Sequence, residues 1–109
     1  MSWKIAHIFF TGASNQCGYK HNWYTYNAMA SILSRARQIA PLRAMAMDIV
    51  NLRCSITPGA LGYLVRCLGS VGLFDKANVL FDQARMMGLC VPNDYSYNCL
   101  LFNSVDLIE

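Results

Sequence analysis

The sequence is short of charge, since Asp, Glu, Lys and Arg make up only 14% of it, against roughly 25% in an average globular domain. Apolar residues make up 55% of the 109 positions. A lone chain of this length has too small an interior to bury so many apolar side chains. The composition therefore favours an array whose units bury two faces, or one part of a larger helical structure.

Signals for metal sites, secretion and membranes are also missing. The five cysteines contain no CxxC pair, and only His7 and His21 could add ligands, so no metal or other cofactor is expected. Because the number of cysteines is odd and no zinc-site spacing occurs, we expect reduced, mostly buried thiols: Cys17, Cys54, Cys67, Cys90 and Cys99. No apolar run reaches the ~18 residues of a membrane span, so no membrane partner is expected. No organellar transit peptide is visible either.

The residues of acid–base and phosphate chemistry are few. Asp75 and Asp82 stand seven positions apart on a surface-type helix face, where capping and solvation explain them. Neither GxGxxG nor GxxxxGK[ST] occurs. The sequence therefore predicts that the chain is not an enzyme. Its net charge of +3 permits an anionic partner without requiring one.

What the sequence does contain is an internal repeat. The phrase NWYTYNAM begins at Asn22, and NDYSYNCL begins at Asn93, close to two 35-residue periods later. Midway between them, PGALGYLVRCLGSVG keeps the apolar spacing of the first copy, and PLRAMAMDIVNLRC matches KANVLFDQARMMGL in the same way. Apolar residues recur at spacings of three and four, so each unit contains two amphipathic helices.

Local signals place the helix ends. Asn22, Thr57 and Asn93 can cap first helices. Gly72 and Gly88 can close the two helices of the 57–92 unit, and three further residues suit first turns: Pro41, Pro58 and Asp75. No stretch alternates with a period of two, so no sheet is expected. We predict an all-α chain with helices at about 3–14, 23–36, 41–52, 58–71, 74–87 and 94–104. The units are 1–21 (partial), 22–56, 57–92 and 93–109 (a truncated start).

The repeat resembles that of the pentatricopeptide repeat family. YTYNAM, YSYNCLL, GLFDKANVLFDQARMMGL and a closing PN carry the resemblance, while the W-x2-L-G-x2-Y signature of tetratricopeptide repeats is absent. The resemblance implies a right-handed α-solenoid of antiparallel helix pairs, with two full repeats and partial repeats at both ends. It also implies binding of single-stranded RNA, about one base per repeat, in RNA processing in a plant mitochondrion or chloroplast.

In this family the fifth and last residues of a unit read the base. By resemblance, Asn27 and Thr57 form the first reading pair and Gly62 and Asn93 the second, while Asn98 begins a third. The base-sandwiching positions hold Tyr24, Gly59 and Tyr95, and Arg35 stands where a basic residue often faces phosphate. Asparagine at the fifth position implies a pyrimidine, whereas Gly62 has no side chain with which to read.

Each of these residues also has a purely structural interpretation. Asn22, Thr57 and Asn93 are good helix caps whatever the chain binds. Arg35 can simply be solvated. The other aromatic and sulfur-containing candidates are expected to pack in the core: Tyr26, Tyr97, Met45, Met47, Met86 and Met87.

The ends of the chain leave further alternatives open. Five apolar side chains are expected to face water: Ile5, Ile8, Phe9, Phe10 and Leu107. They suggest a partial product of a longer protein, which self-associates or docks on another helical protein. The open hypotheses are an RNA-binding module, a protein-interaction scaffold, and a fragment without independent activity.

Overall fold

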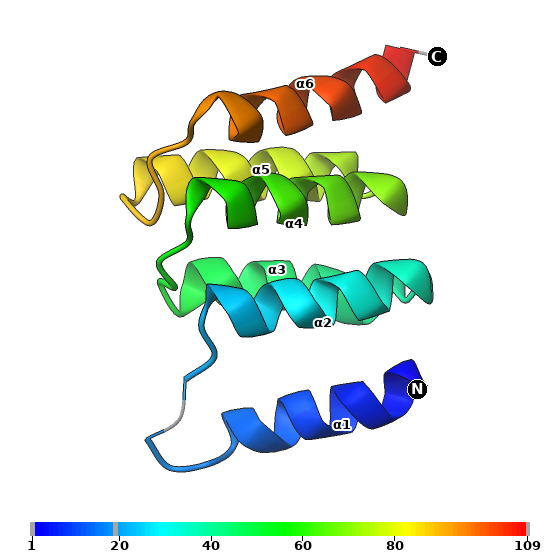
Figure 1. The fold of residues 1–109 in the computed structure, drawn as a ribbon, viewed down its shortest axis with the longest axis vertical. Helices are drawn as coiled ribbons and strands as arrows, with labels where there is room; N and C mark the ends of the chain where they lie inside the picture. Colours follow the sequence, from blue (N-terminus) through cyan, green and yellow to red (C-terminus); the bar gives the residue numbers. More distant parts are fainter. Residues whose placement is uncertain (1, 19, 109) are drawn as a thin grey trace.

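The chain folds into a stack of α-helices (Figure 1). The structure is a computed structural model that describes residues 2–18 and 20–108, with side-chain surroundings described up to residue 104. Within these residues there are six helices and no strand: α1 (Trp3–Ser14), α2 (Trp23–Arg35), α3 (Ile39–Asn51), α4 (Pro58–Ser70), α5 (Phe74–Met86) and α6 (Asp94–Ile108). The all-α prediction is confirmed.

The helices form two layers of a solenoid. In Figure 1, α2, α4 and α6 lie side by side in one layer, and α3 and α5 lie behind them. The pairs α2–α3 and α4–α5 run antiparallel, and each pair packs on the next. At the N-terminal end α1 packs against α2. The molecule is accordingly flat and elongated, with extents of 40 × 29 × 18 Å.

The first helix of each unit begins at a predicted cap. The Thr25 amide donates to Asn22 Oδ1 at 3.0 Å, and the Ala60 amide donates to Thr57 Oγ1 at 3.1 Å. The Ser96 amide donates to Asn93 Oδ1 at 3.1 Å. All three predicted caps are therefore confirmed, and such a cap stabilises a helix by about 0.5–2 kcal/mol.

Four helices end with the same left-handed residue, although only two of these residues are glycines. Gly72 and Gly88 have φ of +84° and +73°, as their predicted closing role requires. Arg37 and Arg53 take the equivalent places one repeat earlier, with φ of 55° and 52°. In each case the next amide bonds back to a buried turn of the helix, from Gln38 to the Leu33 carbonyl at 2.9 Å, for example. The turn geometry is thus kept where the glycine is not.

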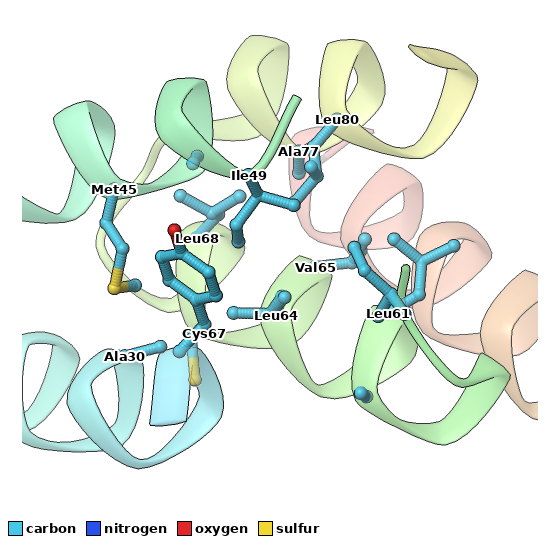
Figure 2. Close-up of a cluster of buried hydrophobic side chains, with 14 of the residues drawn as sticks. Ala30, Met45, Ile49, Leu61, Leu64, Val65, Cys67, Leu68, Ala77 and Leu80 are labelled. Carbon is cyan, nitrogen blue, oxygen red and sulfur yellow. The ribbon is translucent and has the colours of Figure 1, made fainter. Parts of the chain in front are cut away.

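The core is centred on α4, which lies between the other two units. Leu61, Leu64, Val65 and Leu68 are at most 2% exposed. Figure 2 shows them between side chains of the preceding unit and of α5: Ala30, Met45, Ile49, Ala77 and Leu80. Because α4 is buried on both sides, the apolar surplus of the composition is used in contacts between units.

The cysteines are free thiols, and most are shielded, as predicted. Cys67, Cys90 and Cys99 are buried, Cys54 is half-buried and Cys17 is exposed. Burial raises the pKa of the Cys67 thiol, because the thiolate loses its hydration. The three buried thiols therefore act as small apolar core residues.

Two predicted helix boundaries are wrong. The second helix of the first unit begins at Ile39, so Pro41 does not open it but is its third residue. Proline fits there because the amides of the first turn have no partner within the helix. At the other end α6 does not stop near residue 104 but continues to Ile108. No glycine or proline interrupts that segment.

Several predictions of burial are also wrong. Tyr26 is buried as expected, but Tyr97 is 45% exposed, and its ring forms a T-shaped contact with that of Phe81, with the ring centroids 5.1 Å apart. Met45 is buried, whereas Met47 and Met86 lie on exposed faces of α3 and α5. The helical period was identified correctly, but it does not tell which faces a neighbouring helix covers.

The expected exposure of α1 is confirmed in part. Ile5, Ile8 and Phe9 are exposed. Phe10 is not, because its ring stacks on His21 with centroids 3.8 Å apart, and its carbonyl oxygen lies 2.8 Å from His21 Nε2. The side chain of Leu107 lies outside the described ones. Among the described helices, none combines the length and apolar character needed to span a bilayer.

Candidate nucleic-acid interface

The candidate reading residues gather along one edge of the solenoid. Asn27, Gly62 and Asn98 each lie in the N-terminal part of a helix, on α2, α4 and α6. Those three helices are neighbours and start on the same side of the molecule (Figure 1). The caps Thr57 and Asn93 begin two of them. The fold therefore brings the predicted residues into one row, in sequence order.

The first unit holds a buried side-chain oxygen that has no hydrogen-bond partner among the described residues. Asn27 is half-buried, and its Oδ1 atom is buried with no hydrogen-bond partner among residues 2–18 and 20–108. A buried acceptor of this kind costs about 1–3 kcal/mol. Such groups are rare in folded proteins, so each calls for an explanation. Thr57, which is predicted to read the base together with Asn27, accepts a hydrogen bond from the Ala60 amide through its hydroxyl oxygen.

The second unit is built differently, because a tyrosine covers its fifth residue. A Cβ atom added to Gly62 would lie 2.7 and 2.9 Å from Cε2 and Cδ2 of Tyr95, and 3.2 Å from the Cys99 sulfur. Real Cβ atoms do not approach ring carbons so closely. The space of a side chain at position 62 is therefore already filled by the Tyr95 ring. Asn93, the residue predicted to read together with Gly62, accepts from the Ser96 amide.

The other candidates are open to solvent. Asn98 is exposed on α6. Tyr24 is 69% exposed, and its ring meets that of Trp23 edge-on at a centroid distance of 5.9 Å. Gly59 takes the equivalent position on α4, and a Cβ atom added there would meet nothing within 4 Å. An exposed ring beside an open position is a surface on which a nucleobase can stack.

One basic side chain lies near this row, and another lies at the opposite end of α2. Arg35 is exposed in the last turn of α2 and forms no salt bridge within the described part of the chain. Arg66, one turn after Gly62 on α4, is also exposed. A hydrogen bond with the Tyr95 side chain is the largest cause that raises the pKa of Arg66. Both guanidinium groups can therefore attract phosphate.

A separate cavity of about 650 Å³ lies between α1, α2 and α3. Tyr26, Cys54 and Asp48 are among its lining residues, and none of the reading candidates is. Burial raises the pKa of Tyr26 to about 12, with smaller contributions from nearby Cys54 and Asp48. Among the described residues, no three His, Cys, Asp or Glu side chains converge as a metal site would require.

Two buried polar residues that sequence reasoning missed fix α6 on α4. Ser96 donates its hydroxyl to the Pro58 carbonyl at 2.6 Å, and Asn103 donates its amide to the Val65 carbonyl at 3.0 Å. A Cβ at Gly69 would overlap the Asn103 amide. The available signal was the seven-residue spacing of Gly62 and Gly69, which places both on one face of α4 and allows close approach.

Comparison with known proteins agrees with the repeat geometry. The chain is 54% identical, over 98% of its length, to a putative mitochondrial pentatricopeptide repeat-containing protein of Arabidopsis thaliana. The chain belongs to the pentatricopeptide repeat family. Two further pentatricopeptide repeat-containing proteins of this plant, one of them described as putative and mitochondrial, are 26% and 29% identical, each over 85% of the chain. No protein-family model matches the sequence.

These relatives are much longer than the chain. It spans 14% of the length of the first relative and 9% of the length of the second. The units described above thus correspond to a small part of each relative's length.

Proposed function

We propose that this chain is a single-stranded RNA-binding module that acts in organellar RNA processing, with about one base bound per unit. The observation that carries the proposal is the unpartnered Asn27 Oδ1 at the fifth position of the first unit. Its cost to the fold is explained if the half-buried Asn27 side chain turns outward on binding, so that a ligand supplies the missing donor. The family membership and the exposed Tyr24 ring on the same helix support this interpretation.

The chemistry at the first unit follows from the asparagine amide. An amide carries a donor and an acceptor side by side, so it can pair with the edge of uracil or of cytosine. Tyr24 offers a ring face on which that base stacks, and Arg35 offers charge to the phosphate. We therefore propose a pyrimidine preference at this unit, read by Asn27 together with Thr57.

The length of the array sets the affinity. Stacking on an aromatic platform contributes roughly 1–3 kcal/mol per base, so two units supply about 2–6 kcal/mol. A millimolar dissociation constant already corresponds to about 4 kcal/mol. We expect weak binding by this chain alone and stronger binding by a longer array. We propose a mitochondrial site of action because relatives carry that word in their names, with the chloroplast as the alternative.

The test is a fluorescence anisotropy titration with short pyrimidine-rich and purine-rich RNAs. The wild-type chain should bind the pyrimidine-rich RNA more tightly, and Asn27→Ala should lose the difference. Asn78→Ala is a matched control, because Asn78 is an exposed asparagine on α5, outside the layer of α2, α4 and α6. Equal affinity for both RNAs in the wild-type chain would contradict the proposal.

A second candidate function, a helical scaffold, is favoured by the exposed apolar side chains on the outermost helices. Ile8 and Phe9 on α1 are 66% and 71% exposed, and Leu101 and Phe102 on α6 are 62% and 63% exposed. These faces suit another helix, from a second copy or from a helical protein. Concentration-dependent mass in light scattering that is lost in Leu101→Gln, with no effect of Asn27→Ala, would support this candidate.

A further inference from the structure

Gly62 and Tyr95 are complementary in size: Gly62 has no side chain, and the large Tyr95 ring takes up the space that one would fill. The ring of Tyr95 lies where a side chain at position 62 would begin, and the Cys99 sulfur lies 3.2 Å from the same point. Gly62 itself is buried under this contact, although it lies in the row of candidate reading residues. The ring therefore occupies the fifth position of the second unit.

The ring is also held in place. Arg66 lies one turn further along α4, and its hydrogen bond with the Tyr95 side chain is the first cause of its raised pKa. Ser96, the residue after Tyr95, is fully buried and bonds to the Pro58 carbonyl. The backbone beside Tyr95 is thus tied to α4, which keeps the ring next to Gly62.

The first unit has the opposite arrangement. There the fifth position carries a side chain, Asn27 on α2. The corresponding sandwiching position on the neighbouring helix α4 is Gly59, which has open space around it. In the second unit the glycine, Gly62, is at the fifth position on α4. The ring, Tyr95, is at the sandwiching position on the neighbouring helix α6. The larger residue is therefore at the fifth position in the first unit and at the sandwiching position in the second.

We propose that Tyr95 fills the base-reading position of the second unit, so that this unit accepts any of the four bases, while the first unit discriminates. This inference rests on the proposed function. The nucleotide at the second unit then meets a ring face and the Arg66 charge, and neither group distinguishes one base edge from another. The residues at positions 62 and 95 together determine whether the second unit discriminates between bases.

The experiment uses three variants of the whole chain: Gly62→Asn, Gly62→Asn with Tyr95→Val, and, as the matched control, Gly62→Asn with Tyr24→Val. Circular dichroism gives the midpoint of thermal unfolding. Gly62→Asn should lower the midpoint because its Cβ meets the ring. The Tyr95→Val partner should restore it, and the Tyr24→Val partner should not. A midpoint for Gly62→Asn equal to that of the wild-type chain would overturn the inference.

Base discrimination is then measured by anisotropy with a set of short RNAs. Each RNA holds a pyrimidine at the position that Asn27 is proposed to bind, and the nucleotides on either side of that position are varied in turn. The wild-type chain should bind all of these RNAs equally. The Gly62→Asn, Tyr95→Val variant should discriminate by about fivefold or more at one neighbouring nucleotide.

The outcomes separate this inference from the proposed function. If the wild-type chain prefers pyrimidines through Asn27 and also discriminates at the neighbouring nucleotide, the inference is wrong and the proposed function stands. If the double variant folds as well as the wild-type chain and still shows no discrimination, the inference is again wrong. If the wild-type chain binds none of the RNAs, the proposed function fails and the inference falls with it.

Discussion

The hydroxyl of Ser96 donates a hydrogen bond of 2.6 Å to the carbonyl oxygen of Pro58, 38 residues earlier in the chain. This bond joins the first turns of α6 and α4, and Ser96 is fully buried. It therefore fixes the spacing between the starts of two neighbouring units, where the candidate reading residues lie.

Removal of this hydroxyl should weaken the stack. We expect Ser96→Ala to lower the free energy of unfolding by about 1 kcal/mol, the usual net value of a buried hydrogen bond. Ser104→Ala is the control, because the exposed Ser104 hydroxyl bonds only within α6, to the Leu100 carbonyl at 3.3 Å. Urea denaturation of both variants measures the difference. Equal values would show that the link between α4 and α6 contributes nothing.

Glycine should stabilise the two turns where arginine takes a left-handed conformation. Arg37→Gly and Arg53→Gly should each raise the free energy of unfolding by about 1 kcal/mol, because a non-glycine residue at positive φ is strained by about 1–3 kcal/mol. Arg43→Gly, on an exposed face inside α3, should instead destabilise by about 1 kcal/mol. Thermal unfolding followed by circular dichroism distinguishes these opposite signs.

The capping role of Thr57 can be separated from its proposed role in reading. Thr57→Ala removes the acceptor for the Ala60 amide and should cost about 1 kcal/mol, whereas Thr57→Ser keeps the hydroxyl and should cost little. Thr57→Asp also keeps a capping oxygen but changes the group offered to a base. A change in RNA preference in Thr57→Asp, at unchanged stability, is the expected result. If RNA affinity follows only the stability of all three variants, Thr57 is a cap alone.

Asn27→Ala should have opposite effects on stability and on binding. Alanine removes the unpartnered buried oxygen and has a higher helix propensity, so the free energy of unfolding should stay equal or rise, by up to about 1 kcal/mol. The pyrimidine preference should be lost. Urea denaturation and anisotropy on the same sample test both statements. A large loss of stability would mean that Asn27 is a structural residue.

Alkaline pH should destabilise the fold through Tyr26. Burial raises its pKa to about 12 in the folded chain, while the unfolded chain titrates near the ordinary value of 10.0. The folded state therefore holds its proton where the unfolded state has lost it. The stabilising contribution is complete below about pH 10 and is lost as pH rises toward 12. Tyr26→Phe has no proton to lose, so its unfolding midpoint should fall less steeply over that range, as measured by circular dichroism.

Much of the helical layout could be predicted from the sequence, because its signals are local. Asn22, Thr57 and Asn93 cap helices through amides three residues away, and Gly72 and Gly88 close helices within their own turns. The 35-residue period predicted the units, and the resemblance of their motifs led to the family, which the relatives support. Where the local signal was absent, the prediction was wrong: α6 runs past the expected end at residue 104.

Only the tertiary structure decided what fills each reading position. Asn27 and Asn98 have the same residue type and the same place in the repeat, yet Asn27 is half-buried with an unpartnered oxygen and Asn98 is exposed. Gly62 looked like an empty position in the sequence, but Tyr95 fills it from the next unit. The physical reason is distance along the chain: capping is settled within one turn of helix, whereas the space above a residue is settled by the helix that packs on it.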